Sequence, residues 1–207
     1  LAKDRVESDF GMIDFLSEPI PTGKKTDEMR NYGMGEWRDI LTPRQMVVHY
    51  EYLRAYREYA EDIQDEYSEE KAKAILTILS LASSRALSFN SRLSQWFDAR
   101  GYTDKIFTEN NFALKKMCGD NNLSAPRGSY IRRTDQVIDS YEELVTYIDE
   151  PGPTELRNGD AADMGEKWAS ESVDVAVVDP PYYSSIMYAE LSDVFYVIQK
   201  EYLGDIH

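Results

Sequence analysis

The sequence contains one cysteine, Cys118, among its 207 residues. A single cysteine excludes a disulfide framework and a cysteine-rich zinc site within the chain. No uninterrupted apolar run approaches the roughly 18 residues that a membrane-spanning helix requires. The charged opening segment, Leu1–Asp4, does not have the pattern of a signal peptide. These absences predict a cytoplasmic protein with no metal site and no contact with a membrane.

Basic residues are scarce as well. The chain has 23 Lys and Arg against 38 Asp and Glu, which gives a net charge of −15. A protein that binds nucleic acid usually carries a basic surface. Two explanations stay open: the acidic residues form a solvated surface unrelated to the substrate, or the parts that grip a nucleic acid lie elsewhere in a longer polypeptide.

The most informative stretch is a predicted strand, Val173–Asp179, and the residues after it. Its run Val175–Val178 is apolar and mostly β-branched, which is typical of a strand buried on both faces in a parallel sheet. Pro180 and Pro181 lack an N–H and cannot continue a sheet ladder. The chain is therefore predicted to leave the sheet at its carboxyl edge, where open α/β sheets bind ligands.

The tetrapeptide Asp179-Pro180-Pro181-Tyr182 resembles the DPPY signature of S-adenosylmethionine-dependent amino-methyltransferases, which methylate the exocyclic amine of adenine or cytosine. The resemblance implies that these four residues are catalytic. The Asp179 carboxylate and the Pro180 carbonyl would accept the two N–H groups of the amine and free its lone pair to attack the sulfonium methyl group. Tyr182 would stack on a base taken out of the helix.

The same resemblance implies a site for the cofactor, S-adenosyl-L-methionine. Gly159-Asp160 is similar to the position whose acidic residue approaches the adenine of the cofactor, and a simple turn is the alternative interpretation. Asp160 and Asp179 are the predicted cofactor-binding residues. The glycine-rich cofactor loop of the family is absent, because the only Gly-x-Gly pattern, Gly33–Gly35, follows no apolar strand.

The resemblance extends over most of residues 30–204. Tyr188–Val197, Tyr32–Met34 and Thr42–Gln45 look like blocks of long-chain adenine-specific DNA methylases that carry an additional domain of unassigned function. This family implies an α/β fold, with a partial Rossmann-like methyltransferase sheet and a large, mainly α-helical insertion domain. The expected parts are an irregular N-terminal segment (1–41), the helical insertion domain (42–150) and the partial Rossmann-like methyltransferase segment with the DPPY motif (151–207).

Four helices are predicted from capping signals and helical periodicity. They cover about residues 43–65, 69–87, 135–149 and 188–203, with a shorter helix near 111–117 and a short strand at Glu155–Asn158. The later half of the second helix is polar, with Ser84, Arg85 and Ser88. It is interpreted either as a polar wall of a substrate cleft or as a solvated helix end.

We therefore expect a middle fragment of a nucleic-acid amino-methyltransferase that acts on the N6 amine of adenine in DNA. Its partners would be DNA or RNA and the remainder of a longer methyltransferase polypeptide, and the isolated chain would be inactive. Two alternatives stay open. The chain could be a non-catalytic interaction module that retains a methyltransferase remnant, or a methyltransferase of RNA or protein. Protein glutamine methyltransferases generally carry Asn at the position of Asp179, which disfavours the protein substrate.

Overall fold

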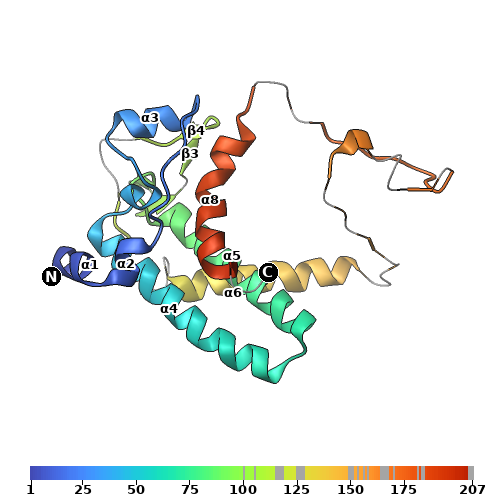
Figure 1. The fold of residues 1–207 in the computed structure, drawn as a ribbon, viewed down its shortest axis with the longest axis horizontal. Coiled ribbons are helices and arrows are strands. Elements are labelled where there is room, and N and C mark those ends of the chain that lie inside the picture. Colours follow the sequence, from blue (N-terminus) through green and yellow to red (C-terminus); the bar gives the residue numbers. More distant parts are fainter. Residues whose placement is uncertain are drawn as a thin grey trace.

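The computed structural model shows a mainly helical protein (Figure 1). It describes residues 1–99, 101–104, 106–114, 119–124, 129–148, 152, 154–155, 157, 159–163, 168–169, 171–180, 182 and 185–204. Within them the α-helices are α1 (Ala2–Ser8), α2 (Phe10–Asp14), α3 (Thr26–Asn31), α4 (Pro43–Glu66), α5 (Glu69–Phe89), α6 (Tyr130–Tyr147) and α8 (Tyr188–Leu203). The remaining elements are the 3₁₀ helices η1 (Trp37–Ile40) and η2 (Ala161–Asp163) and the strands β1 (Gln95–Phe97), β2 (Tyr102–Asp104), β3 (Phe107–Thr108) and β4 (Asn111–Phe112).

Helix α4 begins as the sequence predicts. Thr42 Oγ1 accepts a hydrogen bond from the Gln45 N–H at 3.3 Å, and the Gln45 side chain accepts one from the Thr42 N–H at 2.9 Å. Pro43 occupies the first helical position, where no N–H is needed. This reciprocal pair confirms the predicted capping box and fixes the start of the helix.

Helix α5 lies at the centre of the helical bundle and packs against α4, α6 and α8. Leu76, Ala82, Ala86 and Leu87 are fully buried, and the small alanines allow the neighbouring helices to approach closely. By length and composition alone, α5 is long and apolar enough to cross a membrane. Its packing on three sides accounts for that apolar character.

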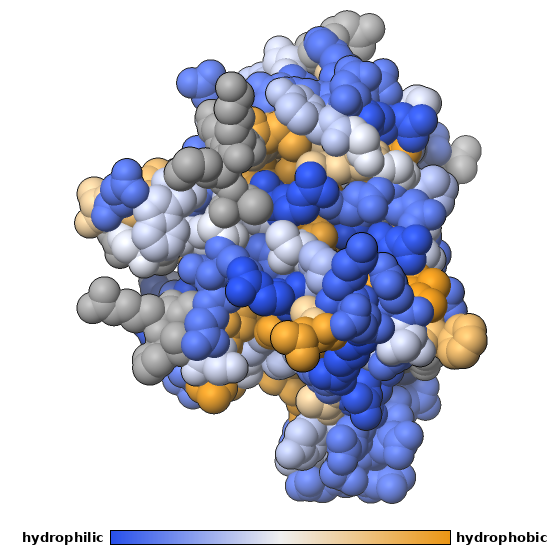
Figure 2. Space-filling model, turned by 90° about the vertical axis from the view of Figure 1, so that its left-hand side faces the viewer, coloured by the Kyte–Doolittle hydropathy of each residue, from blue (hydrophilic) through white to orange (hydrophobic). Residues whose placement is uncertain are grey.

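The N-terminal segment and α8 share one hydrophobic core with α4 and α5. Phe15, Ile20 and Trp37 from the first 41 residues are buried in the same cluster as Val194 and Ile198 of α8. The amphipathic pattern of α8 and its predicted bounds are thereby confirmed. The face that carries α1–α3 is mostly hydrophilic, with scattered apolar patches (Figure 2).

Glu190 of α8 caps α3 from a distant part of the chain. Its Oε2 accepts the N–H groups of Lys25 at 2.6 Å and of Thr26 at 3.2 Å. These N–H groups have no partner within α3 because they lie where the helix begins. Gly23 makes room for the carboxylate, since a Cβ at that position would lie 2.4 Å from Glu190 Oε2. The carboxylate thus fixes α3 to α8.

Replacing Glu190 with alanine should therefore lower the free energy of unfolding by about 1.5–3 kcal/mol, the usual contribution of hydrogen bonds to a charged group. Urea denaturation of the purified chain measures this difference. Glu190→Gln is the matched control, because the amide oxygen of glutamine still accepts a hydrogen bond. This variant should therefore lose less free energy of unfolding than Glu190→Ala. Unchanged stability of Glu190→Ala would show that the capping contact does not stabilise α3.

The predicted Rossmann-like sheet is wrong for the residues that the structure describes. Their sheets are two antiparallel pairs, β1 with β2 and β3 with β4. Residues 171–180 form no strand, and Val175, Val177 and Val178 are 76%, 92% and 77% exposed. No described strand runs beside them, so a buried strand there would leave its backbone N–H and C=O groups unpaired. Helix α8, which follows this segment, packs on α4 and α5.

Three smaller expectations differ in a similar way. The described residues near Glu155 and Arg157 form no strand. Asn111–Phe112 is strand β4 and not the start of a helix. Helix α6 begins at Tyr130, five residues before the predicted position, because Ser129 Oγ accepts the Arg132 N–H at 3.1 Å and caps it there. The predicted domain boundary around Glu150–Pro153 falls mainly outside the described residues and stays a prediction.

Candidate functional site

The predicted catalytic residues lie on an exposed segment. Asp179, Pro180 and Tyr182 are exposed, with Tyr182 at 73%. Pro181 lies outside the described residues. In Figure 1 the described part of this segment runs away from the helical bundle. The motif is therefore presented at the surface, and the described residues build no cavity around it.

The predicted cofactor residues do not form a pocket for S-adenosylmethionine. Asp160 and Asp179 are both exposed, and neither lines the open groove that the described helices form. The Asp160 carboxylate accepts the Ala162 N–H at 2.9 Å, which makes it part of a local turn at the start of η2. This Asx turn agrees with the alternative interpretation of Gly159-Asp160, which was a simple turn. The described residues alone do not fit the cofactor.

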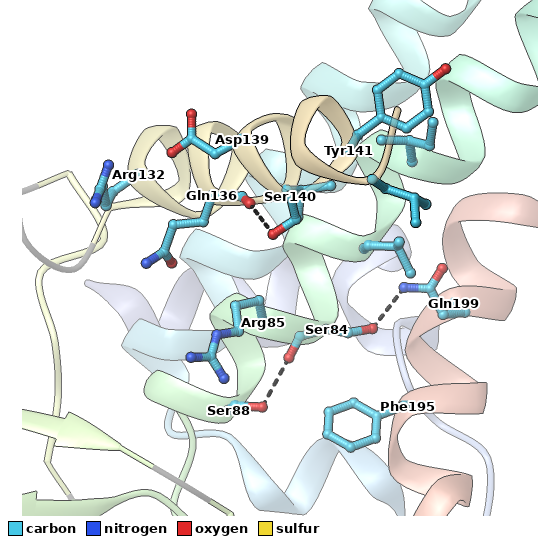
Figure 3. Close-up of a pocket in the computed structure, with 14 residues that line it drawn as sticks. Ser84, Arg85, Ser88, Arg132, Gln136, Asp139, Ser140, Tyr141, Phe195 and Gln199 are labelled. Carbon is cyan, nitrogen blue, oxygen red and sulfur yellow. Dashed lines mark hydrogen bonds between the residues drawn. The ribbon is translucent and has the colours of Figure 1, made fainter. Parts of the chain in front are cut away.

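A groove of about 1080 Å³ opens between α5, α6 and α8 (Figure 3). Ser84, Arg85 and Ser88 form its α5 wall. That this wall belongs to a substrate cleft stays a prediction. Figure 3 shows Arg85 and Arg132 toward one end of the groove, and Phe195 and Gln199 of α8 toward the other. The groove is amphipathic, because arginine and serine side chains share its lining with apolar ones.

Gln199 holds the α8 wall of the groove against α5. Its Nε2 donates to the Ser80 carbonyl at 2.9 Å and to Ser84 Oγ at 2.7 Å, while its Oε1 accepts from Ser80 Oγ at 2.6 Å. Three hydrogen bonds from one amide leave this side chain little freedom. The groove is therefore bounded by a fixed helix pair.

Two arginines, Arg85 and Arg133, lie against the ring of Phe89 at the end of the groove that is farther from α8. The guanidinium carbons of Arg133 and Arg85 lie 3.9 Å and 4.7 Å from the centre of the Phe89 ring. Arg133 is buried and donates to the Gln136 side chain at 2.6 Å. Neither Arg85 nor Arg132 forms an ion pair with a carboxylate in the described part of the chain. Both exposed cations are thus available to an anion in the groove.

A buried polar network fixes the position of α6 behind the groove. His49 of α4 bonds the Tyr130 hydroxyl through Nδ1 and the Asn90 carbonyl, at 2.9 Å, through Nε2. Because a carbonyl only accepts, Nε2 carries the proton and the Tyr130 hydroxyl donates to Nδ1. The Tyr130 ring also stacks on Tyr52, with centroids 3.6 Å apart. The network joins α4, α6 and the residue that follows α5.

Burial determines the ionisation of this network. It lowers the pKa of His49 to about 4, against a smaller raising effect of the Asn90 carbonyl. Burial also raises the pKa of Tyr130 well above its ordinary value, and the neighbouring Tyr52 adds to this effect. His49 and Tyr130 are consequently neutral at pH 7. Within the described ranges, no three His, Cys, Asp or Glu side chains form a group that could hold a metal ion.

Sequence reasoning identified one wall of the groove and missed the other two. Gln136, Ser140 and Tyr141 on α6, and Phe195 and Gln199 on α8, line it together with the predicted α5 residues. The sequence signal for the α6 wall is the series of apolar residues on this helix, several of which are exposed. Tyr141 and Leu144 are 50% and 55% exposed. Arg92, which follows α5, does not line the groove and donates to the Asp39 carbonyl at 2.6 Å.

Comparisons with known proteins identify no relative of this chain. No family model, no curated protein and no solved structure matches it. A proposal about its function therefore rests on its own residues and on the resemblance of Asp179–Tyr182 to the DPPY signature.

Proposed function

We propose that this chain is part of an S-adenosylmethionine-dependent methyltransferase that acts on the N6 amine of adenine in DNA. In this proposal the chain supplies the DPPY residues and the helical body, and other polypeptide supplies the cofactor pocket. The proposal rests on the sequence Asp179-Pro180-Pro181-Tyr182. The structure supports the proposal because the described residues of this motif are exposed. Exposed residues are accessible to a base and to the surface of a second polypeptide.

The apolar run before the motif supports a partner surface. Val175, Val177 and Val178 are largely exposed, although side chains of this type are usually buried. A contiguous apolar stretch at a protein surface commonly marks a site of contact with another molecule. Burial of this run against the polypeptide that holds the cofactor would bring Asp179 to the edge of the completed site.

The chemistry assigned to the motif follows from its functional groups. The Asp179 carboxylate oxygens can accept hydrogen bonds, and so can the Pro180 carbonyl. Two acceptors on the two N–H groups of an exocyclic amine favour a pyramidal nitrogen and localise its lone pair on that atom. Tyr182 offers an aromatic face on which an extruded base stacks. These groups orient and activate the amine.

The test is a methylation assay on the complete polypeptide that contains these residues. It should transfer labelled methyl groups to duplex DNA, with N6-methyladenine as the product identified by mass spectrometry. Transfer to RNA alone, or to protein alone, would replace the proposed substrate. Absence of transfer to any of the three would favour the non-catalytic interaction module, which the exposed valine run also fits.

The 207-residue chain alone should not bind S-adenosylmethionine measurably, because the exposed Asp160 and Asp179 offer the cofactor no enclosed surface. Isothermal titration calorimetry measures this directly. An unrelated methyltransferase with a known cofactor pocket serves as the positive control for the ligand stock. Micromolar affinity of the purified chain would contradict the expectation and would place a cofactor pocket within these residues.

A further inference from the structure

We propose that the groove between α5, α6 and α8 binds a single strand of nucleic acid, with Arg85 and Arg132 on its phosphates and Tyr141 stacked on a base. This inference rests on the proposed function, because it locates where the substrate strand is held. It concerns a surface separate from the DPPY segment. Binding to the groove and methyl transfer can therefore be measured independently.

Charge is the first argument for this occupant. The whole chain carries a net charge of −15, so its overall field repels a polyanion. The groove is more positive than the chain as a whole, because its lining contains two arginines, Arg85 and Arg132, and one carboxylate, Asp139. In Figure 3 Asp139 extends from the side of α6 that faces away from α5.

The preorganisation of the arginines is the second argument. Arg85 lies over the Phe89 ring and has no carboxylate partner among the described residues. Stacking on the ring restricts the side chain while leaving its N–H groups free for a phosphate, which the guanidinium can bind through two parallel hydrogen bonds. Ser88, one helical turn away, adds a hydroxyl to the same wall. These are the groups that phosphate contacts use.

The apolar part of the groove is the third argument. Tyr141 is half exposed, and Leu81 and Leu144 beside it are 48% and 55% exposed. A nucleotide matches these two parts of the groove, because its phosphate is anionic and its base has an apolar face. Stacking on an aromatic side chain suits any base, so this site would hold a strand without reading its sequence. A purely apolar partner helix would leave both arginines without an anion.

The experiment measures fluorescence anisotropy of a labelled single strand of about 12 nucleotides with the full chain at several salt concentrations. Arg85→Ala and Arg132→Ala should each weaken binding roughly tenfold, as expected for one charge-assisted hydrogen bond. Each should also reduce the salt dependence by about 0.7 in the slope of log K against log salt. Tyr141→Ala should weaken binding roughly tenfold, and Tyr141→Phe should preserve it.

Two control variants separate the groove from the overall charge. Arg54→Ala makes the same change in net charge on α4, where Arg54 pairs with Glu51 outside the groove, and it should leave binding unchanged. Asp139→Asn should tighten binding several-fold, because it removes the one carboxylate of the lining. Circular dichroism verifies that these variants of exposed residues stay folded.

The outcomes separate this inference from the proposed function. No binding of the strand, or equal effects of Arg85→Ala and Arg54→Ala, would overturn the groove assignment and leave the methyltransferase proposal standing. An abasic strand that binds as tightly as the normal one would overturn the stacking role of Tyr141. Groove-dependent binding without methyl transfer by the complete polypeptide would support the groove and refute the proposed function.

Discussion

Under the proposed function, replacing Asp179 with alanine in the complete polypeptide should reduce methyl transfer to DNA by about a hundred- to a thousandfold. The substitution removes one of the two acceptors that localise the lone pair of the amine. Loss of one such preorganised hydrogen bond raises the barrier by about 3–4 kcal/mol. Steady-state rates with duplex DNA measure the effect, and cofactor affinity should change little because Asp179 is exposed and lines no cavity in the described residues.

Two further substitutions serve as controls for this prediction. Asp179→Asn keeps one acceptor oxygen without the negative charge, and the rate of methyl transfer should fall between those of the natural sequence and the alanine variant. Tyr182→Ala should weaken binding of the base by about 1–3 kcal/mol through lost stacking, whereas Tyr182→Phe should retain most of the activity. Near-normal turnover of Asp179→Ala would show that the chemistry takes place elsewhere.

Acidification from pH 7 to pH 4 should remove about 3 kcal/mol of stability through His49 alone. The pKa of His49 is about 4 in the folded chain and about 6.5 in the unfolded chain. Its folded-state pKa is lower, so the unfolded chain binds more protons between these values. The contribution of the neutral ring is fully present above pH 6.5 and is lost as the pH falls toward 4.

Protonation also changes the network that positions α6. A charged His49 carries a proton on Nδ1, which can no longer accept from the Tyr130 hydroxyl, so the hydroxyl has to turn and accept this hydrogen bond instead. Urea denaturation of the natural chain and of His49→Gln over pH 4–7 isolates this effect, because the carboxylates titrate in both. The stability difference between the two should shrink by about 3 kcal/mol as the pH falls. Parallel stability curves would rule out His49 as the titrating group.

Local chemistry explains which elements could be predicted from the sequence. Thr42, Pro43 and Gln45 define the start of α4 through contacts within one turn, so no distant residue is needed to place it. The same is true of α8, whose apolar residues recur at helical spacing and are buried on one side. Elements of this kind depend on near neighbours and were placed correctly.

Elements that depend on distant partners were not predictable in the same way. A valine run such as Val175–Val178 has high strand propensity, but a strand forms only where another strand pairs with it. In α6, apolar residues recur at helical spacing, which usually indicates burial, yet Tyr141 and Leu144 are half exposed and line an open groove. The groove itself combines side chains from three helices. Their approach is decided by packing and by contacts such as those of Gln199.

The bond between the Glu201 carboxylate and the Leu16 N–H at 3.1 Å joins residues 185 positions apart. A ribosome makes the chain from its amino end, so Phe15 and Trp37 emerge long before α8, whose Val194 and Ile198 belong to the same core. Until α8 has left the exit tunnel, the apolar surfaces of α4 and α5 that pack against it stay exposed to water. The nascent chain should therefore depend on chaperones during translation, and ribosomes stalled before residue 188 should hold a species that proteases cleave readily.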